Sequence, residues 1–304
     1  MSARILVTGT NGQVGHDLVA ALAGRGEVVG VDRAAMDLAS PDAIARVMRE
    51  VRPAIVLNPA AYTAVDRAES EPELAAAVNA VAPGVLAREA RALGAWLVHY
   101  STDYVFDGEK AGPYVEGDPT APLGVYGRTK LDGERAVAAS GCRHLILRTS
   151  WVYGLRGRNF LATMFRLAGE RDELRVVADQ VGAPTTSRAI AQATAAVVAK
   201  LPAASDPALG PAGGVYHFTC AGSTSWCGFA QAIVDRLPRV ARALGAPAPA
   251  RAPRVTAIRT EDYPTPTRRP KNSVLDNARL ARDFGVSLPA WDAAFEALLA
   301  SAGA

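Results

Sequence analysis

Short apolar runs alternate with longer Ala- and Leu-rich segments through the first half of the chain. The runs that predict strands are 5–8, 28–32, 55–58, 96–101 and 145–149, and the segments that predict helices are 14–23, 42–51, 72–93 and 126–139. Nearly continuous apolar strands separated by helices are typical of a parallel sheet that is covered on both faces. We therefore expect an α/β fold with a doubly wound parallel sheet over residues 1–150, and a ligand crevice at the carboxyl ends of its strands.

The pattern becomes irregular after Trp151. Helical periodicity recurs at 160–169, 189–200, 226–237 and 291–299. Two stretches rich in Pro, Gly and Ala, 202–214 and 247–253, predict surface loops or linkers. Residues 151–304 are thus expected to form mainly a smaller, mostly helical substrate-binding lobe, and we leave open that later segments return to the first domain.

The composition indicates a globular protein of the size of an enzyme and says little more about its function. The 304 residues are 49% hydrophobic and 21% charged, which is ample to bury a core. The net charge of +3 is spread along the chain, apart from the pair Arg268 and Arg269, and indicates neither a nucleic-acid partner nor a membrane surface. Cys142, Cys220 and Cys227 lack the spacing of a zinc site, so we expect reduced, packed thiols and no bound metal.

The chain also lacks the patterns expected of a secreted or membrane protein. Residues Met1 to Arg4 lead directly into an apolar run, which leaves no room for a signal peptide. The longest Ala/Val-rich stretch, 189–199, is too short to cross a bilayer of about 30 Å. We expect a cytoplasmic protein.

A glycine-rich turn follows the first predicted strand. Its sequence is GTNGQVG, with Gly9, Gly12 and Gly15 in GxxGxxG spacing and Gln13 and Val14 at the start of the next helix. Such glycines let the backbone approach a pyrophosphate, whose charge then meets the free N–H groups of the helix. Twenty positions after Gly12, Asp32 ends the second strand, where a carboxylate can accept hydrogen bonds from the adenosine ribose. The combination predicts a Rossmann-type dinucleotide site.

The cofactor could be NADPH or NADH. Arg33 follows Asp32, and a guanidinium there could pair with the ribose phosphate of NADPH. A solvated loop charge is an equally good interpretation of Arg33. The sequence does not decide between the two cofactors.

A Tyr-x-x-x-Lys pair, Tyr126 and Lys130, lies in a predicted helix. Together with GxxGxxG, it resembles the extended short-chain dehydrogenase/reductase family. Residues i and i+4 share a helix face, so we expect the Lys130 ammonium to lie near the Tyr126 phenol and to lower its pKa. Tyr126 would then act as the acid/base of a ketone reduction, and Lys130 would also hold the nicotinamide ribose.

The family resemblance implies further site residues. Thr102, at the end of the fourth strand, would polarise the substrate carbonyl as the third catalytic residue. The alternative for Thr102 is a strand-end hydroxyl that bonds to its own backbone. Asp37 and Leu38 would contact the adenine. The run Asn58-Pro59-Ala60-Ala61-Tyr62-Thr63, at the end of the third strand, would line the cofactor, although Pro59 replaces the more usual alanine of that run.

The substrate class is indicated by the residues after Thr102. The 4,6-dehydratases of this superfamily read Thr-Asp-Glu there and use the glutamate as a base, whereas this chain reads Thr102-Asp103-Tyr104. Without that base, a simple reduction is favoured, with Asp103 binding sugar hydroxyls.

Longer runs resemble the dTDP-4-dehydrorhamnose reductases. They are TAVDRAESEP (63–72), VHYSTDYVF (98–106), RTSWVY (148–153), DQVGAPT (179–185), YPTP (263–266) and RPKNS (269–273). The resemblance implies hydride transfer from NAD(P)H to C4 of dTDP-4-dehydro-L-rhamnose, which gives dTDP-L-rhamnose. It also implies that Trp151 packs on the deoxysugar, and that Gln180, Arg269 and Asn272 close over the nucleotide, with structural turns as the alternative for these last three.

Two other functions stay open at this stage. The β subunit of methionine adenosyltransferase resembles the same family and acts as an NADP-binding regulatory subunit. A sugar-nucleotide epimerase of the short-chain family would retain its NAD through the reaction.

The expected assembly is a monomer or a homodimer. Some members of the family dimerise through Mg²⁺ held by carboxylates, and the matching regions here offer Asp17 but Arg188. A cation in the second place disfavours a metal bridge, so Mg²⁺ is possible as a bound ion but is not expected to join two copies.

Overall fold

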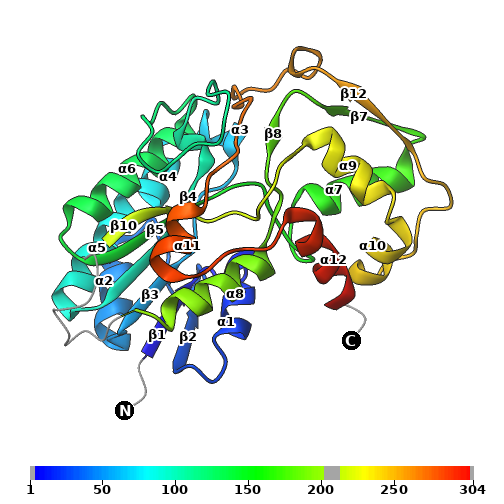
Figure 1. Ribbon diagram of the computed structural model, residues 1–304. Coiled ribbons are helices and arrows are strands. Elements are labelled where there is room, and N and C mark those ends of the chain that lie inside the picture. The colour runs from blue at the N-terminus through cyan, green and yellow to red at the C-terminus, as the bar shows by residue number, and fades with distance from the viewer. Residues whose placement is uncertain (1–3, 202–212, 302–304) are drawn as a thin grey trace.

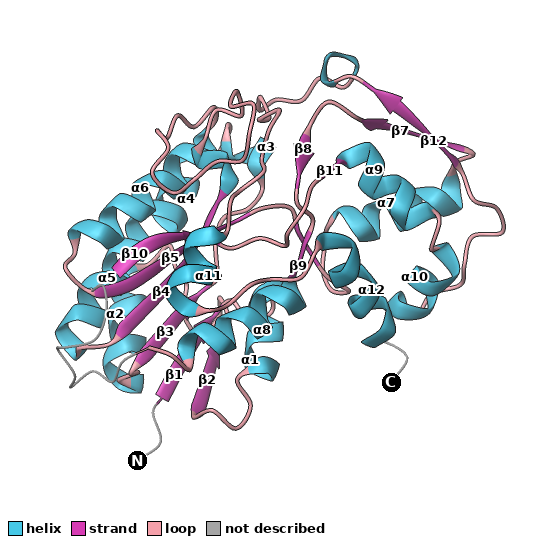
Figure 2. Ribbon diagram, viewed as in Figure 1, coloured by secondary structure: helices cyan, strands magenta, loops and turns pink. Residues whose placement is uncertain are grey.

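The computed structural model describes residues 4–201 and 213–301 and shows a larger α/β lobe beside a smaller, mainly helical one (Figures 1 and 2). The larger lobe contains a parallel sheet of six strands in the order β10-β5-β4-β3-β1-β2. Its strands are β1 (Arg4–Thr8), β2 (Glu27–Val31), β3 (Ile55–Asn58), β4 (Trp96–Thr102), β5 (Arg143–Thr149) and β10 (Gly213–His217). The prediction of a Rossmann-type parallel sheet is confirmed.

Helices cover both faces of this sheet because successive strand residues point to opposite sides. On one face, Ile5 and Val7 pack in a core with α1 (Gln13–Ala21), α8 (Ser187–Val198) and α11 (Ala278–Phe284). On the other face, Leu6 packs in a second core with α2 (Pro41–Val51), α5 (Ala82–Leu93) and α6 (Val125–Ala139). The two groups of helices flank the sheet in Figure 1.

The order of strands creates a point where the chain changes direction across the sheet. Strand β1 lies between β2 and β3. The chain moves to one side of β1 to form β2 and then crosses to the other side of β1 to form β3. In such sheets, ligands bind beside the carboxyl ends of the strands at this point. The turn after β1 and the residues after β3 are therefore the place where a site is expected.

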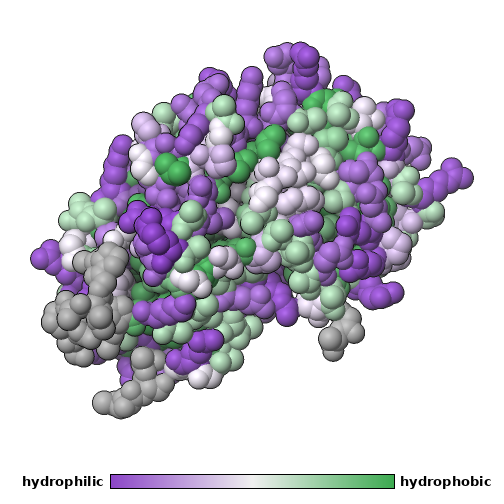
Figure 3. Space-filling view, viewed as in Figure 1, coloured by the Kyte–Doolittle hydropathy of each residue, from purple (hydrophilic) through white to green (hydrophobic). Residues whose placement is uncertain are grey.

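The smaller lobe has its own apolar core. It contains α7 (Phe160–Glu170), α9 (Trp226–Val234), α10 (Leu237–Leu244), α12 (Trp291–Ser301) and the parallel pair β7 (Glu173–Val177) and β12 (Arg254–Ile258). Short strand pairs join its loops, namely β6 (Val152–Tyr153) with β9 (Thr185–Thr186), and β8 (Val181–Gly182) with β11 (Thr224–Ser225). Hydrophilic residues are spread over both lobes on the face shown in Figure 3.

Two of the helices expected in the second half differ from the prediction. The helix expected at 189–200 in the small lobe is α8, and it packs beside α1 on the sheet, because its buried residues Ile190 and Val197 complete the core of that face. The helix expected at 226–237 is two helices, α9 and α10. Pro238 stands in the first turn of α10, where a proline is tolerated, and it could not continue α9.

The helix expected at 72–93 is continuous but not regular. It consists of α4 (Pro72–Ala76), a π-helical turn (Ala77–Val81) and α5. Pro83 has no N–H to offer the carbonyl of Asn79, four residues earlier. That carbonyl instead lies so close to α6 that a side chain at Gly133 would meet it at 2.1 Å. The irregular turn thus lets two helices pack closely.

Some expectations concern residues that the structure does not describe. Residues Met1 to Ala3, on which the expected absence of a signal peptide depends, lie outside the described residues. So do residues 202–212, which make up most of the loop expected at 202–214. Within residues 4–201 and 213–301, no helix combines the length and the apolar character needed to cross a membrane. The three cysteines are free thiols, buried at Cys142 and Cys220 and half-buried at Cys227.

Candidate functional site

A cavity of about 660 Å³ opens at the carboxyl ends of the central strands. Of the residues predicted to form the site, those that line the cavity are Gly9, Gly12, Gln13, Val14, Gly15, Pro59, Ala60, Ala61, Thr63, Thr102, Asp103, Tyr126, Lys130 and Trp151. The structure thus brings the glycine turn, the Tyr-x-x-x-Lys pair and the end of β4 together around one space.

The glycine turn has a shape that only glycine permits. Gly9 has a φ of +60°, and a Cβ on it would lie 2.8 Å from Ala60. A Cβ on Gly15 would lie 2.3 Å from the carbonyl oxygen of Gly9. Gly12 caps α1 without a side-chain hydrogen bond, so the N–H groups of the first helical turn face the cavity uncovered. This arrangement fits a dinucleotide pyrophosphate.

Asp32 follows β2 directly. Its carboxylate accepts hydrogen bonds from the backbone N–H groups of Ala34 and Ala35 and from the side chain of Asn11. The bond from Ala35 is the largest cause that lowers the pKa of Asp32. The carboxylate is therefore ionised and fixed at the strand end, as a ribose-binding acid would need to be.

Asp32, Arg33, Asp37, Leu38 and Tyr62 lie outside the lining of the cavity. The guanidinium of Arg33 is 3.5 Å from the Asp37 carboxylate, and both side chains are exposed. Leu38 is buried in the core beneath α2. The backbone of Tyr62 is held by Asn79, which contacts both its N–H and its carbonyl. The cofactor contacts expected for these residues stay predictions.

Thr102, Asp103 and Tyr126 form the centre of the site. Thr102 is the last residue of β4, and its hydroxyl donates to Asp103 at 2.9 Å. Tyr126, on α6, lines the same cavity. Burial raises the pKa of the Tyr126 phenol above its usual value, and the neighbouring Thr102 hydroxyl opposes this only in part. The phenol therefore keeps its proton at neutral pH.

Lys130, on α6, is held by residues of β4. Its ammonium donates to the backbone carbonyl of Tyr100 at 2.5 Å and lies 3.4 Å from Nε2 of His99. Burial lowers the pKa of Lys130 to about 8, against the opposing charge of Glu134. The prediction that Lys130 lowers the pKa of Tyr126 is wrong for this arrangement, because the amine is held by β4 and the effect of burial on the phenol prevails.

Asp103 is a buried carboxyl group beside these hydroxyls. It is 3% exposed, and burial raises its pKa to about 6. Its second oxygen, Oδ2, makes no hydrogen bond with any residue that the structure describes. An acceptor without a partner at a cavity wall suits a group that binds hydroxyls of a ligand.

Trp151 lies two residues after the end of β5, where the chain passes into the small lobe. It is a non-glycine residue with a φ of +47°, a conformation that costs free energy and is common at functional sites. Its indole is packed closely against Gly182, where a Cβ would meet the ring at 2.6 Å. The ring is thus held in place while it lines the cavity.

Three residues expected to close over the nucleotide contact other parts of the protein instead of the cavity. Gln180 is buried and donates to Thr260 at 3.1 Å. Arg269 forms an ion pair with Asp66 at 2.9 Å, and its second amino group lies 3.3 Å from the hydroxyl of Tyr104. Through Tyr104, whose ring meets Tyr126 edge to face, Arg269 reaches the site indirectly.

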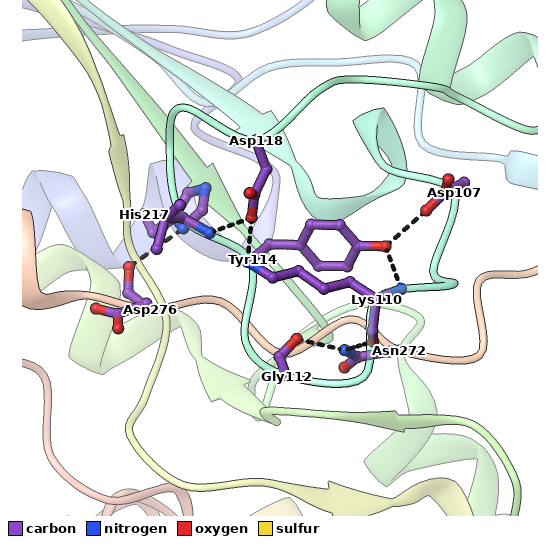
Figure 4. A network of polar contacts seen from close by, with 9 residues as sticks. Asp107, Lys110, Gly112, Tyr114, Asp118, His217, Asn272 and Asp276 are labelled. Carbon is purple, nitrogen blue, oxygen red and sulfur yellow. Dashed lines mark hydrogen bonds and ion pairs between the residues drawn. The ribbon is translucent and has the colours of Figure 1, made fainter.

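Asn272 belongs to a separate polar network (Figure 4). Its amide donates to the carbonyls of Lys110 and Gly112, and its oxygen accepts the N–H of Val274. These contacts favour the structural alternative stated for Asn272, because both ends of the amide are used within the protein.

Sequence reasoning missed much of the cavity wall. The missed residues are Asn11, Val65, Tyr100, Ser101, Tyr104, Thr149, Ser150, Val152, Gly157 and Arg158. Arg158 matters most, since it and Lys130 are the basic side chains among the described residues that line the cavity. Its loop is joined to the glycine turn by a bond from Asn159 to Gln13 at 2.8 Å. In the sequence, the only indication of this part of the site was a cluster of Gly and Arg residues soon after Trp151.

Among the described residues, no group of three or more His, Cys, Asp or Glu side chains could hold a metal ion. Asp17, which was considered as a ligand, instead accepts a hydrogen bond from Ser187 at 2.6 Å.

Comparison with known proteins gives consistent matches over the whole chain. Residues 3–303 match the family model described as the RmlD substrate binding domain. A dTDP-4-dehydrorhamnose reductase of Burkholderia thailandensis is 51% identical over 289 residues, which are 95% of each chain. The reductase of the same name from Escherichia coli K12 is 42% identical over 299 residues, covering 97% of this chain and 96% of its own. A crystal structure of a dTDP-4-dehydrorhamnose reductase from Bacillus anthracis in complex with NADP superposes with a TM-score of 0.88, at 32% identity, over 99% of this chain and all of that one.

Proposed function

The chain belongs to the RmlD substrate binding domain family, and on that premise we propose that it reduces the C4 ketone of dTDP-4-dehydro-L-rhamnose with NADPH or NADH to give dTDP-L-rhamnose. The observation that carries the proposal is that Thr102, Tyr126 and the glycine turn line one cavity. Relatives named for this reaction match nearly the full length of the chain.

The cofactor would be held by the glycine turn and the first turn of α1, with Asp32 at the adenosine ribose. When bound, the reduced nicotinamide supplies the hydride. We also assign Arg158 to the cofactor's pyrophosphate, because a guanidinium on a loop fixed to Gln13 places positive charge beside the N–H groups of α1.

Side chains of the protein would polarise the ketone and supply the proton. Thr102, whose hydroxyl would turn from Asp103 to the substrate, would donate to the ketone oxygen and stabilise the negative charge that develops on it. Tyr126, whose phenol stays protonated because burial raises its pKa, would give its proton to the resulting alkoxide, which is a much stronger base. Asp103 and Trp151 would position the sugar through its hydroxyls and its apolar face.

The decisive experiment supplies the purified protein with dTDP-4-dehydro-6-deoxyglucose, a 3,5-epimerase and NADPH or NADH, and follows the absorbance of the reduced cofactor. One cofactor oxidised for each sugar converted supports the reductase. Cofactor binding without oxidation would indicate the regulatory subunit, and sugar conversion without net oxidation in a reaction that lacks the added 3,5-epimerase would indicate an epimerase.

Assembly and location stay predictions. We expect a monomer or a homodimer that needs no metal, because Arg188 stands where a second carboxylate would be needed and Asp17 is already bonded to Ser187. Sedimentation with and without EDTA tests this, and a dimer that dissociates in EDTA would contradict it. We also still expect a cytoplasmic enzyme.

A further inference from the structure

A chain of buried polar groups runs beneath the cavity, from the end of β1 to α6. It consists of Thr8, Asn58, His99 and Lys130, which are at most 2% exposed. The Thr8 hydroxyl is 2.7 Å from Oδ1 of Asn58, Nδ2 of Asn58 is 3.1 Å from Nδ1 of His99, and Nε2 of His99 is 3.4 Å from Nζ of Lys130. Three strands and one helix thus connect through a single line of hydrogen-bonding groups.

The direction of each bond follows from the one before it. The Thr8 hydroxyl accepts the N–H of Ala60, so its own proton is directed to the carbonyl oxygen of Asn58. The amide nitrogen of Asn58 then faces His99 and donates to Nδ1. The imidazole of His99 is neutral, since burial and the neighbouring Lys130 hold its pKa well below its usual value. A neutral imidazole whose Nδ1 accepts carries its hydrogen on Nε2.

That hydrogen points at Lys130. An ammonium has three donors and no acceptor, whereas a neutral amine has a lone pair that can accept. Lys130 already donates to the carbonyl of Tyr100, so the contact with His99 becomes a hydrogen bond only when the amine is neutral.

The other ionisable groups around Lys130 leave this preference in place. Glu134, on the same helix, attracts a charged Lys130. Its carboxylate is, however, bound through both oxygens by Arg148 of β5, at 2.6 and 2.9 Å. Tyr126, also on α6, and Asp103, after β4, interact with each other, and the buried phenol carries no charge at neutral pH.

We propose that Asn58 and His99 are positioning residues for Lys130: Asn58 fixes the tautomer of His99, and the Nε2–H of His99 then favours the neutral form of the Lys130 amine. The importance of this for catalysis rests on the proposed function, together with the role that the family resemblance implies for Lys130, which is to hold the nicotinamide ribose beside Tyr126. The protonation state of Lys130 would then change within the working pH range, and His99 would set where it changes.

The first test needs no turnover. Nitrogen-15 NMR of the histidines in the full-length protein distinguishes the two tautomers, and the His99 signals are those lost in His99→Gln. We expect a protonated Nε2 and an unprotonated Nδ1 that persist to low pH. A protonated Nδ1 would overturn the proposal.

The second test reverses the tautomer. In Asn58→Asp, the new carboxylate accepts a hydrogen bond, so the proton should move to Nδ1 and leave an acceptor facing Lys130. We expect the midpoint of the Lys130 amine titration, followed by nitrogen-15 NMR, to rise by about 1 pH unit or more. Asn79→Asp adds a buried carboxylate near α6 that does not contact His99, and it should leave the tautomer unchanged.

Enzyme assays then separate this inference from the proposed function. In the natural protein, the alkaline limb of kcat/KM should lie near the pKa of Lys130, at about 8. In Asn58→Asp, it should move upward with the amine titration. An unchanged amine midpoint in Asn58→Asp would overturn the proposal. An inactive natural protein with the expected tautomer would contradict only the proposed function.

Discussion

Trp151 and Trp226 lie face to face, with ring centroids 3.5 Å apart and planes inclined by 8°. Trp151 lines the cavity, whereas Trp226 begins α9 in the small lobe and also contacts Phe160. The stack therefore connects the core of the small lobe to the cavity wall. It supports the indole of Trp151, the residue whose backbone has a φ of +47°.

Replacing Trp226 should weaken sugar binding without affecting the cofactor. In Trp226→Leu, Trp151 loses the ring that holds it, and an aromatic pair is worth about 0.5–1.5 kcal/mol. We expect the KM for the dTDP-sugar to rise by about 3- to 10-fold, with an unchanged Kd for NADPH measured by fluorescence. Trp291→Leu removes another ring of this lobe, one that contacts Phe229, and is the control. An equal rise in KM in both variants would mean that the lobe, and not the stack, is responsible.

Removing the phenol of Tyr126 should stop the reaction at the proton transfer. Tyr126→Phe should lower kcat by about 10²- to 10⁴-fold, the usual contribution of a general acid. Binding of NADPH should stay close to that of the natural protein, because the hydroxyl is needed mainly as charge develops on the substrate. Tyr263→Phe, at a phenol that is 59% exposed, is the matched control. Turnover near the natural rate in Tyr126→Phe would remove Tyr126 as the proton donor.

Asp103 should make the protein less stable at neutral pH than in mild acid. Its pKa is raised from 3.8 to about 6 by burial, so the folded state binds the proton more tightly than the unfolded state. The stabilisation is present below about pH 4 and is lost as the pH rises through 6, a difference of at most about 3 kcal/mol. Asp103→Asn should therefore unfold at higher urea concentration than the natural protein at pH 8. That advantage should shrink towards pH 4, and an advantage independent of pH would contradict the assignment.

Arg158 should contribute to cofactor binding through charge. A hydrogen bond to a charged group contributes about 1.5–3 kcal/mol, so Arg158→Gln should raise the Kd for NADPH by about 10-fold or more. The effect should be similar for NADH and absent for nicotinamide mononucleotide, which lacks the pyrophosphate. Arg156→Gln changes an exposed arginine two positions earlier in the same loop, which does not line the cavity, and should have little effect. Loss confined to NADPH would instead assign Arg158 to the ribose phosphate.

The parallel sheet and the glycine turn could be predicted because they depend on local patterns. The alternation of apolar strands and helices, and the glycines that precede α1, are visible in short windows of sequence. The same holds for Thr102, since the end of a strand is the edge of a parallel sheet at which sites form. Their positions around the cavity follow from the fold class alone.

Contacts between distant segments could not be predicted in this way. Helical spacing placed Tyr126 and Lys130 on one face but said nothing of β4, whose His99 and Tyr100 hold the amine. Arg158 was missed because its loop meets Gln13 across 146 positions of sequence. Asn272 lies in a run typical of the family, yet its amide is used by the loop around Lys110.

The last strand of the central sheet has a consequence for how the chain is synthesised. Strand β10 pairs with β5 in parallel register, Gly213 beside His144, although α7, β7 and α8 lie between them in the sequence. Until that strand leaves the ribosome, β5 remains an open edge whose N–H and C=O groups have no partner, and such edges invite aggregation. The ribosome must therefore reach the third quarter of the chain before β10 can cover the edge of β5, so translation speed and chaperone access over that interval should affect the yield of native enzyme.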